Sequence, residues 1–316
     1  MKSGVYDDIP FAEYCSIDAV NKSSLDLFAI SALHYLHRDR TNKDTPAKRL
    51  GTAIHTAILE PDRFKEEYRA EPSPEDFPQA LCSADDYKRM CERMDLPKTG
   101  TKEVLKARIQ EVERVHDLEP VPFFDEIEAE LAKYKLLKKD QLWTALSIAE
   151  NVRTSPIAQV IMGEGKAERT LIWVDEETGV LCKCRLDWLL NDFSIALDIK
   201  STQLGGASPH KFQKACAEYN YHRQAAWYLD GVKALSGIDA QFIFGAYETE
   251  SPYASAFYYA SQRMIEQGRS ENRYLLNKYV HCKKTNEWPG YSETIEPIDL
   301  PPWKSLDREM GINDGQ

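Results

Sequence analysis

The sequence predicts a mixed α/β fold, in which a central sheet is flanked by helices and a helical module is inserted into the first half of the chain. Apolar side chains recur with helical spacing up to about residue 153, whereas three consecutive runs from 168 to 200 alternate apolar and polar side chains. Helical spacing returns at 209–234, and two more alternating runs precede a last helix near 261–283. Strands and helices in this order form a packed α/β core.

Composition and charge exclude several classes of protein. No stretch of the 316 residues approaches the ~18 uninterrupted apolar residues of a membrane helix, and the N-terminal MKSGVYDDIPFAEY lacks the apolar core of a signal peptide. We therefore expect a cytoplasmic protein without membrane contact. The seven scattered cysteines contain no C-x-x-C pair, which argues against a zinc ribbon or an iron–sulfur cluster. The net charge of −11 argues against a protein that coats a polyanion, but a local basic surface could still recruit DNA.

Two helices are predicted near the N-terminus. Residues 21–37 have the spacing of a helix that begins at Ser23 or Ser24 as its N-cap. A basic linker follows at 37–49. The stretch LGTAIHTAILEPDRF then predicts a second helix, which Pro61 ends.

The inserted module follows a proline-rich linker at 72–82. Residues 83–117 have the pattern of a helix, a turn and a second helix, with Ser83 as the first N-cap and a turn with Pro and Gly at 95–101. After two further prolines, a charged helical segment is predicted from about 125 to 153.

The alternating runs predict three successive strands. They are TLIWVD (170–175), VLCKCRLDWLL (180–190) and FSIALDIK (193–200). Turns are expected at EETG and at Asn191–Asp192. In the second strand, Leu186 and Trp188 would share one face, while Asp187 would point to the other.

Two aspartates and a lysine interrupt these apolar strands, although buried charges are costly unless they are paired or bind metal. If Asn191–Asp192 forms a two-residue turn, Asp198 faces Arg185, and Asp187 becomes its diagonal neighbour with Cβ atoms about 7 Å apart. Two such carboxylates can hold a hard cation such as Mg²⁺, which polarises a phosphate and lowers the pKa of bound water. Lys200, on the same face, could orient that water or stabilise developing negative charge.

A structural explanation of the same charges stays open at this point. Asp198 could pair with Arg185, and Asp187 with Lys183, as salt bridges without a catalytic role. Glu168, just before the first strand, is expected to be a solvated strand end, although it could join the acidic site.

The arrangement D-x(10)-D-I-K resembles the motif of PD-(D/E)xK nucleases, in which an acidic residue precedes a hairpin-linked (D/E)-x-K. His55 in GTAIHTAILEPDRF resembles the helix-borne histidine of RecE-type nucleases, the exodeoxyribonuclease VIII family. Gln224 and Tyr228 in YHRQAAWYLDG match the Q-x-x-x-Y motif of RecB-like nucleases. EWPGY (287–291) and LPPW (300–303) are similar to the ending of the RecE-type family, so the matches span most of the chain except the insert.

The resemblance implies a restriction-endonuclease-like PD-(D/E)xK core built from residues 1–82 and 118–316, with the insert at 83–117. It implies that a metal ion is held by His55, Asp187, Asp198 and the backbone carbonyl of Ile199. Lys200 would be the catalytic lysine, and Gln224 and Tyr228 would act beside the catalytic carboxylates. The ion would be Mg²⁺, with Mn²⁺ an alternative because histidine is among the ligands.

The insert has a resemblance of its own. MDLPKTGTKEVLKARIQ, residues 94–110, is similar to the SAP motif, a small helix–turn–helix module that binds DNA. Phosphate contacts, which carry little sequence preference, would come from Lys98, Lys102, Lys106 and Arg108. The alternative is a helical hairpin that braces the nuclease or lies between subunits.

The resemblance implies a metal-dependent DNA exonuclease of a phage or prophage recombination system, in the cytoplasm of a bacterial or phage-infected cell. Such an enzyme degrades one strand of duplex DNA from its 5′ end and leaves a 3′ overhang for a single-strand-annealing partner. A homo-oligomeric ring with a basic inner wall would reconcile the acidic net charge with DNA binding.

A pocket for the 5′ phosphate is expected at the start of the first helix, where anions are favoured. It would be formed by Ser23 and Ser24, with Arg38, Arg40 or Arg49 nearby, although ordinary capping explains the serines equally well. Two other functions remain open. One is a RecB-like nuclease that acts on single strands or flaps in repair or defence, and the other is a nuclease-fold DNA-binding protein that acts through the insert without catalysis.

Overall fold

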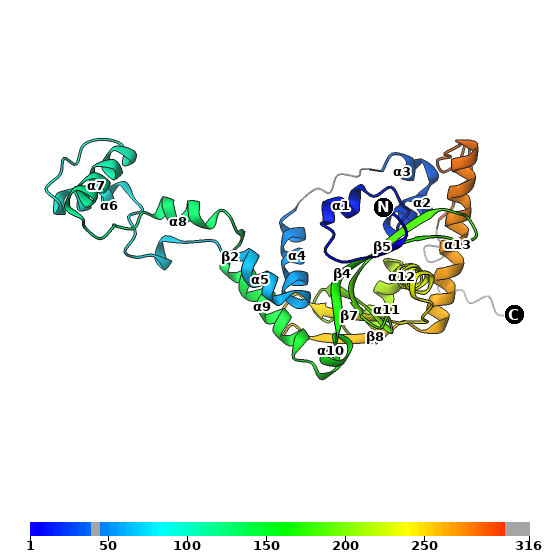
Figure 1. The fold of residues 1–316 in the computed structure, drawn as a ribbon. Helices are drawn as coiled ribbons and strands as arrows, with labels where there is room; N and C mark the ends of the chain where they lie inside the picture. The colour runs from blue at the N-terminus through cyan, green and yellow to red at the C-terminus, as the bar shows by residue number, and fades with distance from the viewer. Residues whose placement is uncertain (39–44, 301–316) are drawn as a thin grey trace, which may run out of the picture.

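The structure, a computed structural model, describes residues 1–38 and 45–300 and is built around one six-stranded sheet (Figure 1). The strand order is β1-β4-β5-β6-β7-β8, and all neighbours are antiparallel except β6 and β7. The strands are β1 (Gly4–Tyr6), β4 (Gly165–Val174), β5 (Leu181–Leu190), β6 (Ile195–Thr202), β7 (Gln241–Glu248) and β8 (Ser255–Tyr259). This mixed sheet with flanking helices confirms the predicted α/β fold class.

Helices cover both faces of the sheet, and each face has its own hydrophobic core. The helices of this body are α1 (Phe11–Ser16), α2 (Lys22–Ile30), α3 (Ala32–Leu36), α4 (Pro46–Leu59), α5 (Pro61–Glu67), α9 (Lys139–Arg153), α10 (Pro156–Ile161), α11 (Pro209–Glu218), α12 (Tyr221–Ser236) and α13 (Gln262–Thr285). The first core packs α2, α12 and α13 against the sheet through residues such as Phe28, Trp227 and Leu276. The second core packs α4 and α9 against the other face through Ile54 and Ile148.

The first predicted helix, 21–37, is two helices. Ser31 has an extended backbone (φ −167°, ψ 159°), and its hydroxyl accepts a hydrogen bond from the backbone N–H of His34, which starts α3. The N-cap of α2 is Asn21, so the prediction of Ser23 or Ser24 is wrong. Asn21 Oδ1 accepts from the backbone N–H of Ser24 at 2.9 Å, and Ser24 Oγ accepts from the backbone N–H of Asn21 at 3.0 Å. This reciprocal capping box places Ser24 in the first turn.

Two other predicted helices differ in the same way. Pro61 ends α4 but also opens α5, because its missing N–H is not needed in a first turn. The stretch 209–234 divides into α11 and α12 at Asn220, which has a left-handed backbone conformation (φ 53°).

The β5–β6 connection is longer than predicted. The register pairs Trp188 with Leu197 and Leu189 with Ala196, so the loop covers 191–194, with Phe193 in the left-handed region (φ 61°). The predicted two-residue turn at Asn191–Asp192 is therefore wrong, and the pairing is shifted by two residues. Continued by one residue, this register sets Asp187 opposite Asp198 instead of diagonal to it, at the point where the regular ladder ends.

β4 starts at Gly165, earlier than predicted, and therefore includes Glu168. Glu168 lies opposite Asp187 between two regular pairs, and its backbone is left-handed (φ 53°), which is unusual for a residue with a side chain. The regular alternation breaks here. Leu186 packs in the first core but Trp188 packs against the second, so the prediction that they share a face is wrong.

The insert forms a separate lobe that stands away from the sheet, at the far left of Figure 1. Its elements are η1 (Pro74–Asp76), α6 (Ala84–Arg93), α7 (Lys102–His116) and α8 (Phe124–Leu131). The chain leaves the body through β2 (Tyr68–Ala70) and returns through β3 (Lys135–Leu137), which pair in parallel. The small core of the lobe is formed by Leu81, Tyr87, Cys91, Leu105, Ile109 and Phe123. The predicted helical segment 125–153 is thus interrupted by β3.

Among the described residues, no helix is both long and apolar enough to cross a bilayer. Part of the basic linker, residues 39–44, and most of the LPPW segment, residues 301–303, lie outside the described residues.

Candidate active site

The candidate site lies where β5 and β6 separate. Asp187 Oδ2 accepts a hydrogen bond of 2.6 Å from the backbone N–H of Ile199, so a side-chain carboxylate takes the place of a strand carbonyl. The regular β5–β6 ladder contains two residue pairs, whereas β6 and β7 share eight. The N–H and C=O of one strand residue point to the same side of the strand. The Ile199 carbonyl therefore faces the same gap as Asp187.

His55 reaches this gap from helix α4. Its Nδ1 lies 3.8 Å from Asp187 Oδ2, and 29% of its side chain is exposed. The neighbouring Ile54 and Ile58 anchor α4 in the second core, which fixes the side of the helix that carries His55. The ring of Tyr247 from β7 lies edge-on to the imidazole, with the centroids 6.4 Å apart.

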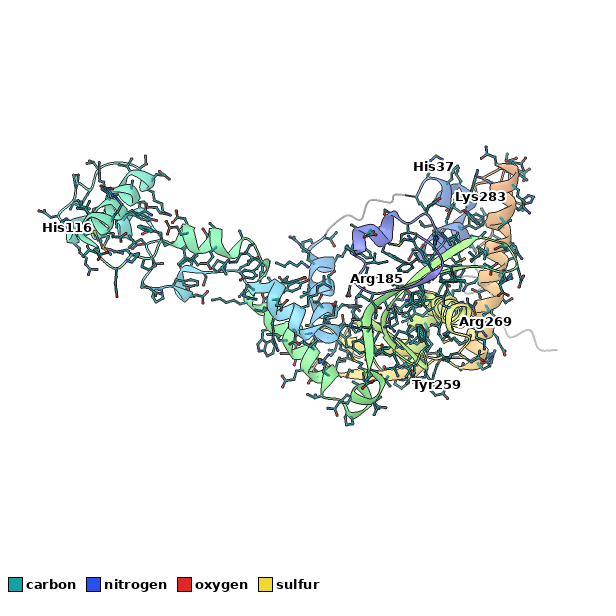
Figure 2. All side chains as sticks on the ribbon, in the orientation of Figure 1. His37, His116, Arg185, Tyr259, Arg269 and Lys283 are labelled. Atoms are coloured by element: carbon teal, nitrogen blue, oxygen red, sulfur yellow. The ribbon has the colours of Figure 1, made fainter. Side chains whose placement is uncertain are left out.

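Glu168 is the residue of this site for which the sequence favoured a solvated strand end over a place in the acidic site. Within the described residues, ligand atoms of His55, Glu168 and Asp187 lie within 4.8 Å of one another. Arg185 Nε donates to Glu168 Oε2 at 2.5 Å and its Nη1 donates to the carbonyl of Ile9 at 2.8 Å. Figure 2 labels Arg185 on β5, close to the N-terminal segment. Glu168 is thus not a solvated strand end, and Arg185 pairs with it rather than with Asp198.

Asp198 and Lys200 form the other half of the site. The Lys200 ammonium lies 2.5 Å from Asp198 Oδ2, and Gln224 Nε2 donates to Asp198 Oδ1 at 2.6 Å. Asp198 is only 3% exposed; one of its oxygens is hydrogen-bonded by Gln224, while the other is in an ion pair with Lys200. Gln224 comes from α12 on the first-core face, whereas His55 comes from α4 on the second-core face. Side chains from both faces of the sheet therefore meet at the gap.

Tyr228 lies one turn beyond Gln224 on α12 and packs against the first core, with its ring edge-on to Phe242 at 6.0 Å. Burial raises the pKa of Tyr228 well above its usual range, and the charges of Asp198 and Asp187 raise it further. Its hydroxyl therefore keeps its proton at neutral pH and can act as a donor.

The electrostatics of the site match a cation-binding set. Burial raises the pKa of Asp187 well above its ordinary value, and the nearby charges of Asp198 and Glu168 add to this effect. Burial lowers the pKa of His55, which keeps the imidazole neutral. Burial alone would lower the pKa of Lys200, but Asp198 and Asp187 outweigh it and raise that pKa. A neutral imidazole beside crowded carboxylates is a donor set that a divalent cation stabilises.

The residues expected around a 5′ phosphate are not equally available. Ser24 is buried and its hydroxyl belongs to the capping box of α2. The guanidinium of Arg38 lies over the ring of Tyr35 and donates to its carbonyl. Ser23 and Arg49 are exposed, and Arg49 also interacts with a neighbouring group.

The basic residues of the insert make intramolecular contacts. Lys98 pairs with Glu92 at 2.7 Å, and Lys106 pairs with Asp125 at 2.7 Å. Arg108 donates to the carbonyls of Pro97 and Thr99, so it closes the turn between α6 and α7. Lys102 lies 5.2 Å from the centroid of the Tyr87 ring.

Comparisons with known proteins agree with this geometry. A crystal structure from Eubacterium rectale, described as a "putative exonuclease", superposes with a TM-score of 0.52 at 11% sequence identity, covering 92% of each chain. At this identity the likeness shows the fold alone. No match was found among curated proteins. The profile of a family described as "PDDEXK-like domain of unknown function (DUF3799)" matches residues 23–301. The fold, the match and the acidic site together support a nuclease, and the chain belongs to this PDDEXK-like family.

Proposed function

We propose that this protein is a divalent-metal-dependent exodeoxyribonuclease that hydrolyses phosphodiester bonds in DNA. One observation carries the proposal: His55, Glu168 and Asp187 converge from three elements, directly beside the Asp198–Lys200 pair. Structural salt bridges would leave each carboxylate beside a cation. Here Asp187 instead faces an imidazole, a backbone N–H and another carboxylate, an arrangement that favours a bound cation.

The ion would be held by His55, Asp187, Asp198 and the Ile199 carbonyl, with Glu168 as an additional ligand. We expect Mg²⁺, or Mn²⁺ because of the imidazole. When bound, the ion would neutralise phosphate charge and lower the pKa of a water molecule.

The remaining residues have distinct proposed roles. Lys200 keeps its proton, so its ammonium can orient the attacking water or stabilise the charge that develops on the phosphate. Gln224 is a positioning residue, since its amide fixes one oxygen of Asp198. Tyr228, also protonated, would act through hydrogen bonding rather than as a base.

The finer assignment rests on the resemblance to RecE-type nucleases. We propose 5′-to-3′ action on duplex ends that leaves a 3′ overhang for a single-strand-annealing partner in phage-type recombination. A homo-oligomeric ring is part of this proposal, and so is an accessory phosphate contact by the SAP-like lobe. The second candidate is a RecB-like nuclease for single strands or flaps, which the exposed Tyr219 favours, because its ring stacks on Tyr221 beside Lys200.

Digestion of linear duplex DNA labelled at one end, with Mg²⁺, Mn²⁺ or EDTA, tests the proposal. We expect metal-dependent loss of the strand from its 5′ end, and no cutting of closed circular duplex. Preferred cleavage of single strands or flaps would favour the second candidate. Nicking of closed circles would contradict an exonuclease, and complete inactivity with either metal would contradict a nuclease.

A further inference from the structure

An aromatic row leads from the candidate site to the protein surface. Phe244 on β7 stacks with Tyr221 at a centroid distance of 5.8 Å, and Tyr221 stacks with Tyr219 at 5.7 Å. Phe212 of α11 also contacts Tyr221, which holds the middle ring in place. The last ring of the row is accessible, because 55% of Tyr219 is exposed.

The row begins at the proposed catalytic lysine. The Lys200 ammonium lies 4.6 Å from the centroid of the Tyr221 ring, while it also pairs with Asp198. Tyr219 is therefore a single stacking step beyond the ring that Lys200 covers. A phosphate bound at Lys200 would place a neighbouring nucleobase within reach of Tyr219.

The backbone at Tyr219 is anchored by a side chain from α2. Tyr219 lies at the break between α11 and α12, where Asn220 adopts a left-handed conformation (φ 53°). The ammonium of Lys22 donates to the Tyr219 carbonyl at 3.1 Å and pairs with Asp26 at 2.7 Å. Lys22 and Lys200 thus each contact one tyrosine of this short row, and Lys214 is exposed on α11. Exposed aromatic rings among ammonium groups are the usual means of binding single-stranded nucleic acid.

We propose that Tyr219 is a stacking platform for the nucleobase next to the scissile phosphate, in a strand that is single or frayed at that position. The proposal rests on the proposed nuclease function and deepens it, since stacking on Tyr219 requires an unpaired base. Because every base has a π-face, such a platform favours unpaired ends without reading their sequence.

The test measures binding of a fluorescent oligo-dT strand of about 12 nucleotides, by anisotropy with Mn²⁺, in an Asp198→Asn background that prevents cleavage. We expect Tyr219→Ala to weaken binding roughly 5- to 100-fold and Tyr219→Phe to preserve it. Matched controls are Tyr259→Ala and Tyr274→Ala, because these tyrosines are 69% and 62% exposed. Circular dichroism checks that each variant is folded.

A second arm moves one abasic site stepwise along the strand. One position should weaken binding when residue 219 is tyrosine and have no effect in Tyr219→Ala, because each change removes the same contact. Equal binding by Tyr219→Ala and the parent, or an abasic effect that persists in Tyr219→Ala, would overturn the platform. If the native protein, with Asp198 intact, cleaves DNA, that result leaves the nuclease function intact. If the native protein neither binds nor cleaves DNA, both proposals fall together.

Discussion

The candidate site and the inserted lobe both contain many charged residues, but they use them differently. At the site, Asp187 and Asp198 are largely buried, and their partners His55 and Gln224 come from distant parts of the chain. In the lobe, exposed pairs such as Lys88–Asp85 and Arg114–Glu111 lie three residues apart. Exposed local pairs contribute little, whereas buried like charges are kept only where something compensates for them. Charged residues with a functional role are therefore distinguished from those that only keep the surface soluble by their burial and by how far away in the chain their partners lie. Residue type alone does not distinguish them.

The largest expected effect is at Lys200. Lys200→Met should lower the rate of DNA cleavage at saturating substrate by roughly 10²- to 10³-fold or more, because it removes a charge aimed at the reacting phosphate. Lys284→Met, at an exposed position near the end of α13, is the matched control and should leave that rate unchanged. Equal activity of the two variants would show that Lys200 has no catalytic role.

A substitution at Glu168 tests whether its carboxylate is one of the metal ligands. Glu168→Gln should weaken Mn²⁺ binding by about tenfold or more, measured by calorimetry, if its carboxylate is a ligand. The control is Glu176→Gln, an exposed residue in the β4–β5 turn. An unchanged affinity would reduce Glu168 to a structural partner of Arg185.

The raised pKa of Asp187 predicts a pH dependence of metal-linked stability. Between the pKa values of the unfolded and folded states, folded Asp187 keeps a proton that the unfolded chain has lost. The free energy of unfolding of the metal-free protein therefore falls as pH rises through this window. A cation favours the ionised carboxylate, so Mn²⁺ should raise Tm more at about pH 8 than at about pH 5.

Thermal unfolding with and without Mn²⁺ checks this expectation. Asp187→Asn should flatten the difference between the two pH values. If the variant keeps the same pH-dependent shift as the native protein, another group is responsible.

The smallest effect is expected in the lobe. Replacement of residues 80–125 by a Gly/Ser linker should leave the cleavage rate at saturating DNA unchanged, because the lobe has its own core. If the lobe contacts one or two phosphates, the slope of log affinity against log salt should fall by about 1 to 2. Binding experiments between low and high salt measure this slope. An unchanged slope would favour a role of the lobe in bracing or assembly. Loss of cleavage activity at saturating DNA would show that catalysis also depends on the lobe.

The sequence predicted much of the site, for reasons that can be stated. Asp187, Asp198 and Lys200 were singled out because they are charges within apolar strands and match the D-x(10)-D-I-K pattern, and neither signal depends on the exact strand register. Glu168 was assigned to a solvated strand end because a left-handed backbone inside a strand leaves no mark in the residue pattern. Ser24 was misassigned because Asn21, three residues earlier, competes for the same cap.

In the lobe, the sequence predicted the helices but not the partners of the charged side chains. The spacing of Ser83 and the turn residues predicted both helices, but no pattern could tell that Lys106 would pair with Asp125, nineteen residues later. Local helix signals are contained in a few neighbouring residues, whereas the partner of a charge depends on tertiary packing. For the same reason the accessibility of Tyr219 could not be foreseen.

The short β5–β6 ladder has a mechanical consequence. Within the described residues, two residue pairs join these strands while eight join β6 to β7, so the sheet has a seam along its weakest line. Helix α12 contacts β4 and β5 on one side of the seam and β7 on the other, and thus holds the two parts of the sheet together. Local opening is easiest where few backbone hydrogen bonds resist it. Substitutions that extended the β5–β6 ladder would raise the thermal stability of the protein. They would also close the gap that the acidic residues need, so greater stability at this boundary would lower activity.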